Sequence, residues 1–115
     1  MLFRSSTAIS GCLGLKESRW RTAYQSRFGS ARWLEPGTTE TLIELAQAGV
    51  ETIDILCPSF AVDCLETLEE IAMENAEEFL TAGGKQLRYI PCLNDCTGHV
   101  NFFCDLITSK LELSV

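Results

Sequence analysis

The sequence contains one histidine, no two cysteines in C-x-x-C spacing, and only nine lysines and arginines among its 115 residues. Its six cysteines therefore lack the spacing and the histidine partners that a zinc site uses. Sixteen acidic residues outnumber the basic ones, which gives a net charge of −7 at pH 7. Because nucleic acids are bound by clustered basic side chains, we exclude nucleic acid as a partner. The cysteine spacing and the single histidine exclude zinc as a structural metal.

Long hydrophobic runs are also missing, since no stretch approaches the roughly 20 apolar residues of a membrane-spanning helix. Residues 9–12 resemble a bacterial lipoprotein cleavage box, but Ser5, Ser6 and Thr7 interrupt the short apolar stretch before it. We therefore expect no integral membrane segment and a bacterial cytoplasmic location. There the cysteines are expected to be reduced thiols, several of them buried. They are Cys12, Cys57, Cys64, Cys92, Cys96 and Cys104.

The composition, with 46% hydrophobic and 22% charged residues, is that of a globular protein with one modest core. Three short apolar runs, at residues 20–25, 52–57 and 86–91, predict strands. The Ile and Leu residues in these runs do not alternate strictly with polar ones, which is typical of parallel strands covered on both faces. Helix-like segments separate the runs, so we predict one α/β domain.

Four helices are expected beside these strands. The first covers residues 4–13, the second runs from Thr38 to Gly49, and the third covers residues 64–82 and is stopped by Gly83 and Gly84. The last helix carries an apolar stripe at helical spacing, which we interpret as core. This stripe consists of Val100, Phe103, Cys104, Ile107 and Leu111.

The segment most informative about chemistry covers residues 59–70, where the second predicted strand is followed by the third helix. Open α/β sheets bind ligands at the carboxyl ends of their strands. At 100° per residue, one face of this helix carries Glu66, Glu70, Met73 and Glu77. The opposite face carries Leu65, Leu68, Ile71, Ala72 and Phe79, and is predicted to be core. Carboxylates in a row facing a cleft can take up a hard divalent cation or accept protons.

Two structural interpretations of the same acidic residues stay open. Asp63 and Glu66 have the spacing of a capping box, in which the Glu66 side chain reaches back to a backbone N–H. The acidic row is also compatible with a helix face that only contacts solvent.

Four separated stretches carry a resemblance to a known family. They are YQSRFG at residues 24–29 with WL at 33–34, CPSF at 57–60, DCLETLEEI at 63–71, and GG at 83–84 with YIP at 89–91 and LN at 93–94. In this order and spacing they resemble the C-terminal part of the ferrochelatases, which insert Fe(2+) into protoporphyrin IX to form haem. The resemblance extends over nearly the whole chain, from residue 5 to residue 106.

The resemblance implies particular roles for five residues. Glu66 matches the active-site glutamate, a catalytic residue that also contacts the metal, and Glu70 matches the next acidic residue on a metal or proton path. Trp33 matches an aromatic residue beside the macrocycle. Phe60 and Asp63 match positions that line the cleft and are implied to bind substrate. The loop at residues 25–29 matches a border of the same cleft.

The implied fold is a three-layer α/β chelatase-like domain with a parallel sheet of three to four strands flanked by helices. Residues 1–115 would form an incomplete C-terminal domain, because the N-terminal domain and its catalytic histidine are absent from this sequence. Ser59 and Gly37 depart from the family pattern, where glycine and an aromatic residue are usual. His99 is interpreted as a surface or cap residue. Fe(2+) is expected as a substrate, with no permanently bound cofactor and no iron–sulfur cluster.

Three functional hypotheses follow. The first is a partial ferrochelatase with porphyrin and ferrous iron as partners, inactive alone. The second is a non-catalytic porphyrin- or metal-binding module, or a half-enzyme that needs a separate N-terminal domain. The third is a short homodimeric chelatase of the kind that acts on cobalamin or sirohaem precursors, but those enzymes use histidines for the metal and this chain has only His99.

Overall fold

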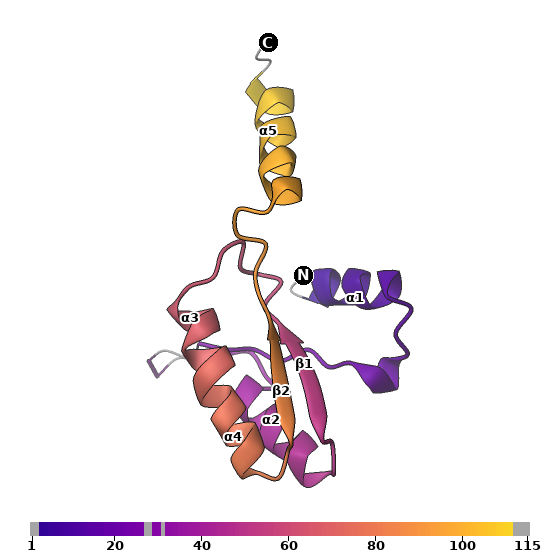
Figure 1. The fold of residues 1–115 in the computed structure, drawn as a ribbon, viewed down its shortest axis with the longest axis vertical. Coiled ribbons are helices and arrows are strands. Elements are labelled where there is room, and N and C mark those ends of the chain that lie inside the picture. The colour runs from indigo at the N-terminus through magenta and orange to yellow at the C-terminus, as the bar shows by residue number, and fades with distance from the viewer. Residues whose placement is uncertain (1–2, 27–28, 31, 112–115) are drawn as a thin grey trace.

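The structure, a computed structural model, describes residues 3–26, 29–30 and 32–111. Two strands and their connecting helices form its centre, and two further helices lie at the ends of the chain (Figure 1). In chain order the elements are α1 (Phe3–Cys12), the 3₁₀ helix η1 (Glu17–Arg19), α2 (Thr38–Gln47), β1 (Thr52–Leu56), α3 (Leu65–Leu68), the π-helical segment η2 (Glu70–Asn75), α4 (Ala76–Thr81), β2 (Gln86–Ile90) and α5 (Thr97–Leu111).

Strands β1 and β2 pair in parallel, with Thr52 opposite Gln86 and Leu56 opposite Ile90. The helices α3, η2 and α4 connect them as a crossover, as parallel strands require. The α/β class is therefore confirmed, as are the strands predicted at residues 52–57 and 86–91. Within the described residues, however, the sheet has two strands rather than three or four.

The core lies between one face of this sheet and the helices α2 and α4. Leu42 and Ala46 of α2 pack with the fully buried Phe79 of α4. Alternate strand residues, Ile53, Ile55 and Leu87 among them, close this cluster from the sheet side. The other strand residues are exposed, so the described residues form two layers and not the three that we predicted.

Glycines end both core helices as the sequence predicts. Gly49 follows α2 with a φ of 89°, and the next amide, that of Val50, donates to the carbonyl of Leu45 over 3.0 Å. Gly83 follows α4 with a φ of 113°, and the amide of Gly84 donates to the carbonyl of Phe79, also over 3.0 Å. In both cases the glycine in the left-handed conformation reverses the direction of the chain. The next amide can then bond a carbonyl in the last turn of the helix, and the chain continues toward a strand.

The prediction of a strand at residues 20–25 is wrong. This segment forms a single parallel bridge, between Tyr24 and Gly37. The Tyr24 N–H donates to the carbonyl of Pro36, and the Thr38 N–H donates to the carbonyl of Tyr24. The bridge cannot extend into a pair of strands in either direction. Pro36 has no N–H to donate, and the segment opposite Tyr24 enters α2 at Thr38. The apolar composition of this segment was therefore not enough to form a strand, because the neighbouring segment pairs with it at one residue only.

The interpretation of the α5 stripe as core is also wrong. Within the described residues α5 contacts no other helix or strand, and it projects from the rest of the molecule (Figure 1). The stripe residues Val100, Phe103 and Ile107 are 47%, 43% and 48% exposed. No helix among the described residues is long and apolar enough to cross a membrane.

The third predicted helix forms, but it contains a π-helical turn that the sequence did not reveal. Its buried residues, Thr67, Ile71, Asn75 and Phe79, recur at every fourth position. In a regular α-helix this spacing drifts by about 40° per step, whereas wider i to i+5 turns, such as Glu74 N–H to Glu69 C=O at 2.9 Å, hold the four residues on one face. Leu65 and Leu68, predicted to be core, lie off this face and are exposed.

The cysteines are less buried than the sequence suggested. Cys57 is buried and Cys64 and Cys92 are partly buried, whereas Cys12, Cys96 and Cys104 are exposed. The expectation of several buried thiols therefore holds fully for Cys57 alone.

Candidate functional site

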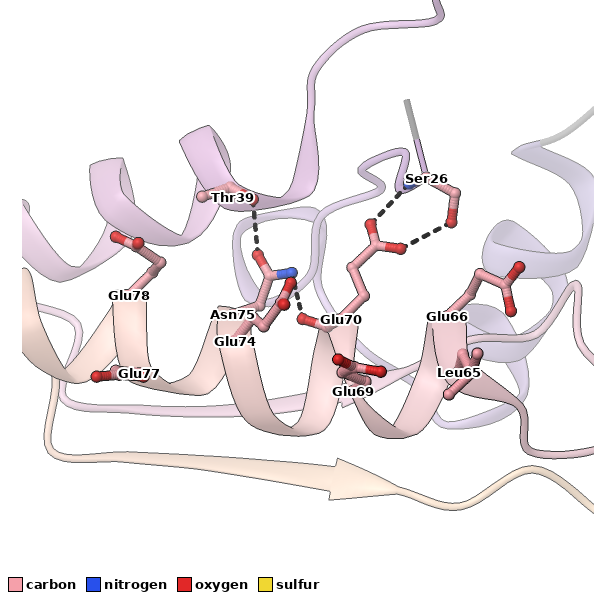
Figure 2. A pocket seen from close by; sticks show the side chains of 10 residues that line it. All are labelled: Ser26, Thr39, Leu65, Glu66, Glu69, Glu70, Glu74, Asn75, Glu77 and Glu78. Atoms are coloured by element: carbon pink, nitrogen blue, oxygen red, sulfur yellow. Dashed lines mark hydrogen bonds between the residues drawn. The ribbon is translucent and has the colours of Figure 1, made fainter. Parts of the chain in front are cut away.

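An open acidic groove of about 650 Å³ runs along the helix formed by α3, η2 and α4 (Figure 2). Ser26 and Thr39 border it from two other parts of the chain. The residues that line it are Ser26, Thr39, Leu65, Glu66, Glu69, Glu70, Glu74, Asn75, Glu77 and Glu78. Glu66 and Glu70, predicted from the sequence, therefore share one groove.

The Glu70 carboxylate is held by one residue from the loop before α2. The backbone N–H of Ser26 donates to Oε1 of Glu70 over 2.7 Å, and the Ser26 hydroxyl donates to Oε2 over 2.9 Å. Ser26 adopts the left-handed conformation, with a φ of 61°, which turns both donors toward the helix. Ser26, from the loop at residues 25–29, thus borders the acidic groove. Arg27 and Phe28 of this loop lie outside the described residues.

Glu66 is partly buried and is held through its main chain. The side-chain amide of Gln25 donates to the Glu66 carbonyl over 2.7 Å, and the Cys57 thiol donates to the Gln25 side-chain oxygen over 3.2 Å. Burial raises the pKa of Cys57 to about 12, so its thiol stays protonated and available as a donor. A hydrogen bond from Cys64 and one from its own amide lower the pKa of the Glu66 carboxyl, which favours the ionised form.

The predicted capping box between Asp63 and Glu66 does not form. The helix instead begins after Cys64, whose backbone N–H donates to the Thr67 hydroxyl over 3.0 Å. Thr67 is fully buried and takes the position that the sequence argument gave to Glu66. The Glu66 side chain is therefore free of this capping role.

Asp63 lies at the centre of a polar network. Its Oδ1 accepts hydrogen bonds from Tyr89 at 2.6 Å, Thr67 at 3.0 Å and the Cys92 amide at 3.3 Å. Its Oδ2 accepts from the Asn94 amide at 2.8 Å, and Asn94 accepts from the Asp63 backbone N–H at the same distance. The bonds from Asn94 and Tyr89 hold the pKa of Asp63 far below its usual range. Desolvation and the bond to Asp63 raise the pKa of Tyr89.

This network joins the loop after β1 to the loop after β2, and no local pattern in the sequence predicts it. Asn94 has a φ of 49°, a conformation that asparagine tolerates better than most residues. The carboxyl ends of the two parallel strands are thereby tied together beside the start of the acidic helix. His99 follows, with its Nδ1 2.6 Å from the Asn94 carbonyl and its ring against Phe103, near the start of α5.

The two aromatic residues implied to contact substrate lie outside the groove lining. Trp33 is 41% exposed on the segment before α2, and Phe60 is partly buried in the turn after β1. Asp63 also lies outside the lining, with its carboxylate engaged in the network described above. The groove therefore brings together Glu66 and Glu70 but not the other three predicted residues.

Several groove residues were missed because the prediction used α-helical spacing throughout. Glu66, Glu70, Glu74 and Glu78 recur at four-residue intervals, like the buried stripe beside them. That regular spacing was visible in the sequence. Ser26 and Thr39 are separated from the helix by tens of residues and carried no such signal. In the part of the chain that the structure describes, no three His, Cys, Asp or Glu side chains converge to hold a metal ion.

A parallel βαβ unit with helices packed on its sheet places the protein in the α/β class. The chain belongs to the ferrochelatase family, because the family model Ferrochelatase matches residues 2–111. Ferrochelatases of Bordetella pertussis and Nitrosococcus oceani are 54% and 51% identical to it over 100 and 109 residues. The ferrochelatase of Polaromonas sp. is 61% identical over 92 residues. No solved structure matches the chain.

These alignments cover most of this chain but a minor part of each relative. They include 87% of the chain and 28% of the Bordetella protein, 95% and 30% for the Nitrosococcus protein, and 80% and 25% for the Polaromonas protein. The matched region is the C-terminal part of the relatives. The chain therefore spans less than a third of their length and resembles a partial ferrochelatase.

Proposed function

We propose that this chain forms the acidic wall of a metal–porphyrin chelatase that inserts ferrous iron into a porphyrin during haem biosynthesis. The observation that carries the proposal is the shared groove of Glu66 and Glu70 in a chain of the ferrochelatase family. Both carboxylates belong to one helix that starts beside the carboxyl ends of the strands.

Metal insertion defines what such a wall must do. A free-base porphyrin that takes up Fe(II) releases two protons from its pyrrole nitrogens, so the site needs cation ligands and proton acceptors. In this proposal Glu66 is the catalytic residue that accepts a proton from the macrocycle, and Glu66 and Glu70 together bind the incoming cation. The lowered pKa of Glu66 supports the cation-binding part of this role, because it keeps the carboxylate ionised.

Three further residues are proposed to contact or border the porphyrin. Trp33 and Phe60 would offer apolar surface to the flat macrocycle. Asp63 would border the same slot, and because its carboxylate already accepts four hydrogen bonds, it would act mainly by holding the slot in shape.

The proposal includes no resident cofactor. Iron enters as a substrate, and the cysteine spacings match no standard iron–sulfur pattern. We place the reaction in the bacterial cytoplasm, a compartment in which free thiols such as these six persist.

The facing wall of the porphyrin slot is proposed to come from a ferrochelatase N-terminal domain. Relatives are more than three times as long as their match to this chain, which supports a need for more protein than these 115 residues. We therefore expect the chain to be inactive alone.

Reconstitution tests this function. The purified chain is mixed with the separately expressed part of the Bordetella pertussis ferrochelatase that its match does not cover, and porphyrin absorbance is followed with ferrous iron and with zinc. Metal insertion by the mixture, absent from either component and from a mixture with Glu66→Gln, supports the proposal. Porphyrin binding without insertion by the mixture would instead favour a non-catalytic binding module.

A further inference from the structure

The segment Gln25–Ser26 contacts the acidic helix at two successive turns. Gln25 holds the main chain at Glu66, and Ser26 holds the side chain of Glu70 through two hydrogen bonds of 2.7 and 2.9 Å. Figure 2 shows both Ser26 donors facing the Glu70 carboxylate across the groove. Two residues distant in sequence from the helix therefore fix both of its proposed functional positions.

The contacts leave Glu70 fixed but still able to bind a ligand. A carboxylate offers about four lone-pair sites, and the two donors of Ser26 occupy one on each oxygen. The flexible glutamate side chain is thereby held in one conformation, with its remaining lone pairs beside the groove. Metal-ligating carboxylates are commonly oriented by such outer hydrogen bonds.

The same segment makes a different contact with Glu66. Gln25 contacts only its backbone carbonyl, and the Glu66 carboxylate receives no hydrogen bond from the 25–26 segment. The two glutamates are therefore unequal: the Glu70 carboxylate is oriented from outside the helix, whereas that of Glu66 has only local partners.

We propose that Ser26 is a positioning residue that orients Glu70 as a fixed cation ligand, while Glu66, whose carboxylate has only local partners, exchanges cation and protons. This inference rests on the proposed function, because it assigns the two glutamates different tasks within the same site. It extends the site to a residue that would act only through Glu70.

The left-handed backbone at residue 26 allows a clean test. Ser26→Gly keeps the φ of 61° and the backbone N–H but removes the hydroxyl donor. Ser26→Asn tolerates the same backbone and supplies a side-chain N–H in place of the hydroxyl. Ser59→Gly is the matched control, because Ser59 is exposed and lies outside the groove lining.

Binding of Mn²⁺ to the full chain is the measurement, since Mn²⁺ prefers carboxylates to thiols. Its dissociation constant is obtained from the free-ion electron paramagnetic resonance signal, and paramagnetic broadening of nuclear magnetic resonance signals locates the ion. We expect broadening at Glu66 and Glu70. We also expect Ser26→Gly to weaken binding by about tenfold, Ser26→Asn to recover part of this loss, and Ser59→Gly to change nothing.

Three different results would overturn the inference. If the wild-type chain binds Mn²⁺ at Glu66 and Glu70 and Ser26→Gly binds it equally well, Ser26 does not position Glu70, although the proposed function stands. If Mn²⁺ broadens neither glutamate in the wild type, both the inference and the cation-binding role of the groove fail. A loss of affinity that follows a lowered melting temperature, and that Ser26→Asn does not restore, indicates a merely structural role and also contradicts the inference.

Discussion

The hydroxyl of Tyr89 donates a 2.6 Å hydrogen bond to Oδ1 of Asp63, the same oxygen that accepts from Thr67 in the first turn of α3. One carboxylate oxygen thus connects strand β2 to the helix that carries Glu66 and Glu70. This oxygen therefore helps, together with the buried core, to hold the acidic helix against the sheet, even though Asp63 lies outside the groove lining.

Acid should weaken the fold through Asp63. Its pKa is lowered in the folded state, chiefly by Asn94 and Tyr89, so its stabilising effect is complete above the unfolded pKa of about 4 and declines as the pH falls further toward the folded value. We expect the urea midpoint of the wild type to drop more between pH 6 and pH 3 than that of Asp63→Asn. Equal drops in the two proteins would show that Asp63 does not cause the acid sensitivity.

The two neighbouring residues Glu66 and Thr67 should respond oppositely to substitution. Thr67→Val removes a buried hydroxyl that bonds Cys64 and Asp63, and is expected to cost about 1–3 kcal/mol in urea unfolding. Glu66→Gln should change the free energy of unfolding by less than about 1 kcal/mol, because the hydrogen bonds that its carboxylate accepts, from Cys64 and its own amide, are local, and it should abolish metal insertion in the reconstituted mixture. The catalytic assignment is wrong if Glu66→Gln loses stability and retains turnover.

Gly84 should not tolerate a larger residue. A Cβ atom at this position would overlap the ring of Phe79, which is fully buried in the core. We expect Gly84→Ala to destabilise the fold by about 1–3 kcal/mol, measured by chemical denaturation. Gly98→Ala is the control, because nothing lies within 4 Å of the added Cβ there, and it should leave stability unchanged or slightly increased.

Helix α5 should contribute little to the stability of the core. Phe79→Ala empties a fully buried site and is expected to cost about 3–5 kcal/mol, whereas Ile107→Ala, at a position 48% exposed, should cost less than about 1 kcal/mol. Urea unfolding of the two variants provides the comparison. A cost at Ile107 as large as that at Phe79 would mean that α5 packs against the body of the protein.

Elements defined by local sequence were predicted well. The apolar runs at β1 and β2 gave both core strands, and the glycines after α2 and α4 marked helix ends that the structure confirms. The run at residues 20–25 failed because a strand needs a partner, and the chain opposite Tyr24 enters a helix at once. For α5, periodicity identified the helix but not what its apolar stripe would contact.

The sequence by itself determined the family, the α/β class and the presence of Glu66 and Glu70 on one helix, because these depend on local pattern and on ordered motifs. Only the tertiary structure decided which donors those carboxylates meet. Ser26 reaches Glu70 across 44 residues and Tyr89 reaches Asp63 across 26, contacts that no local spacing encodes. The tertiary structure also revealed the π-helical turn, whose wider hydrogen bonds keep the buried residues at every fourth position on one face of the helix.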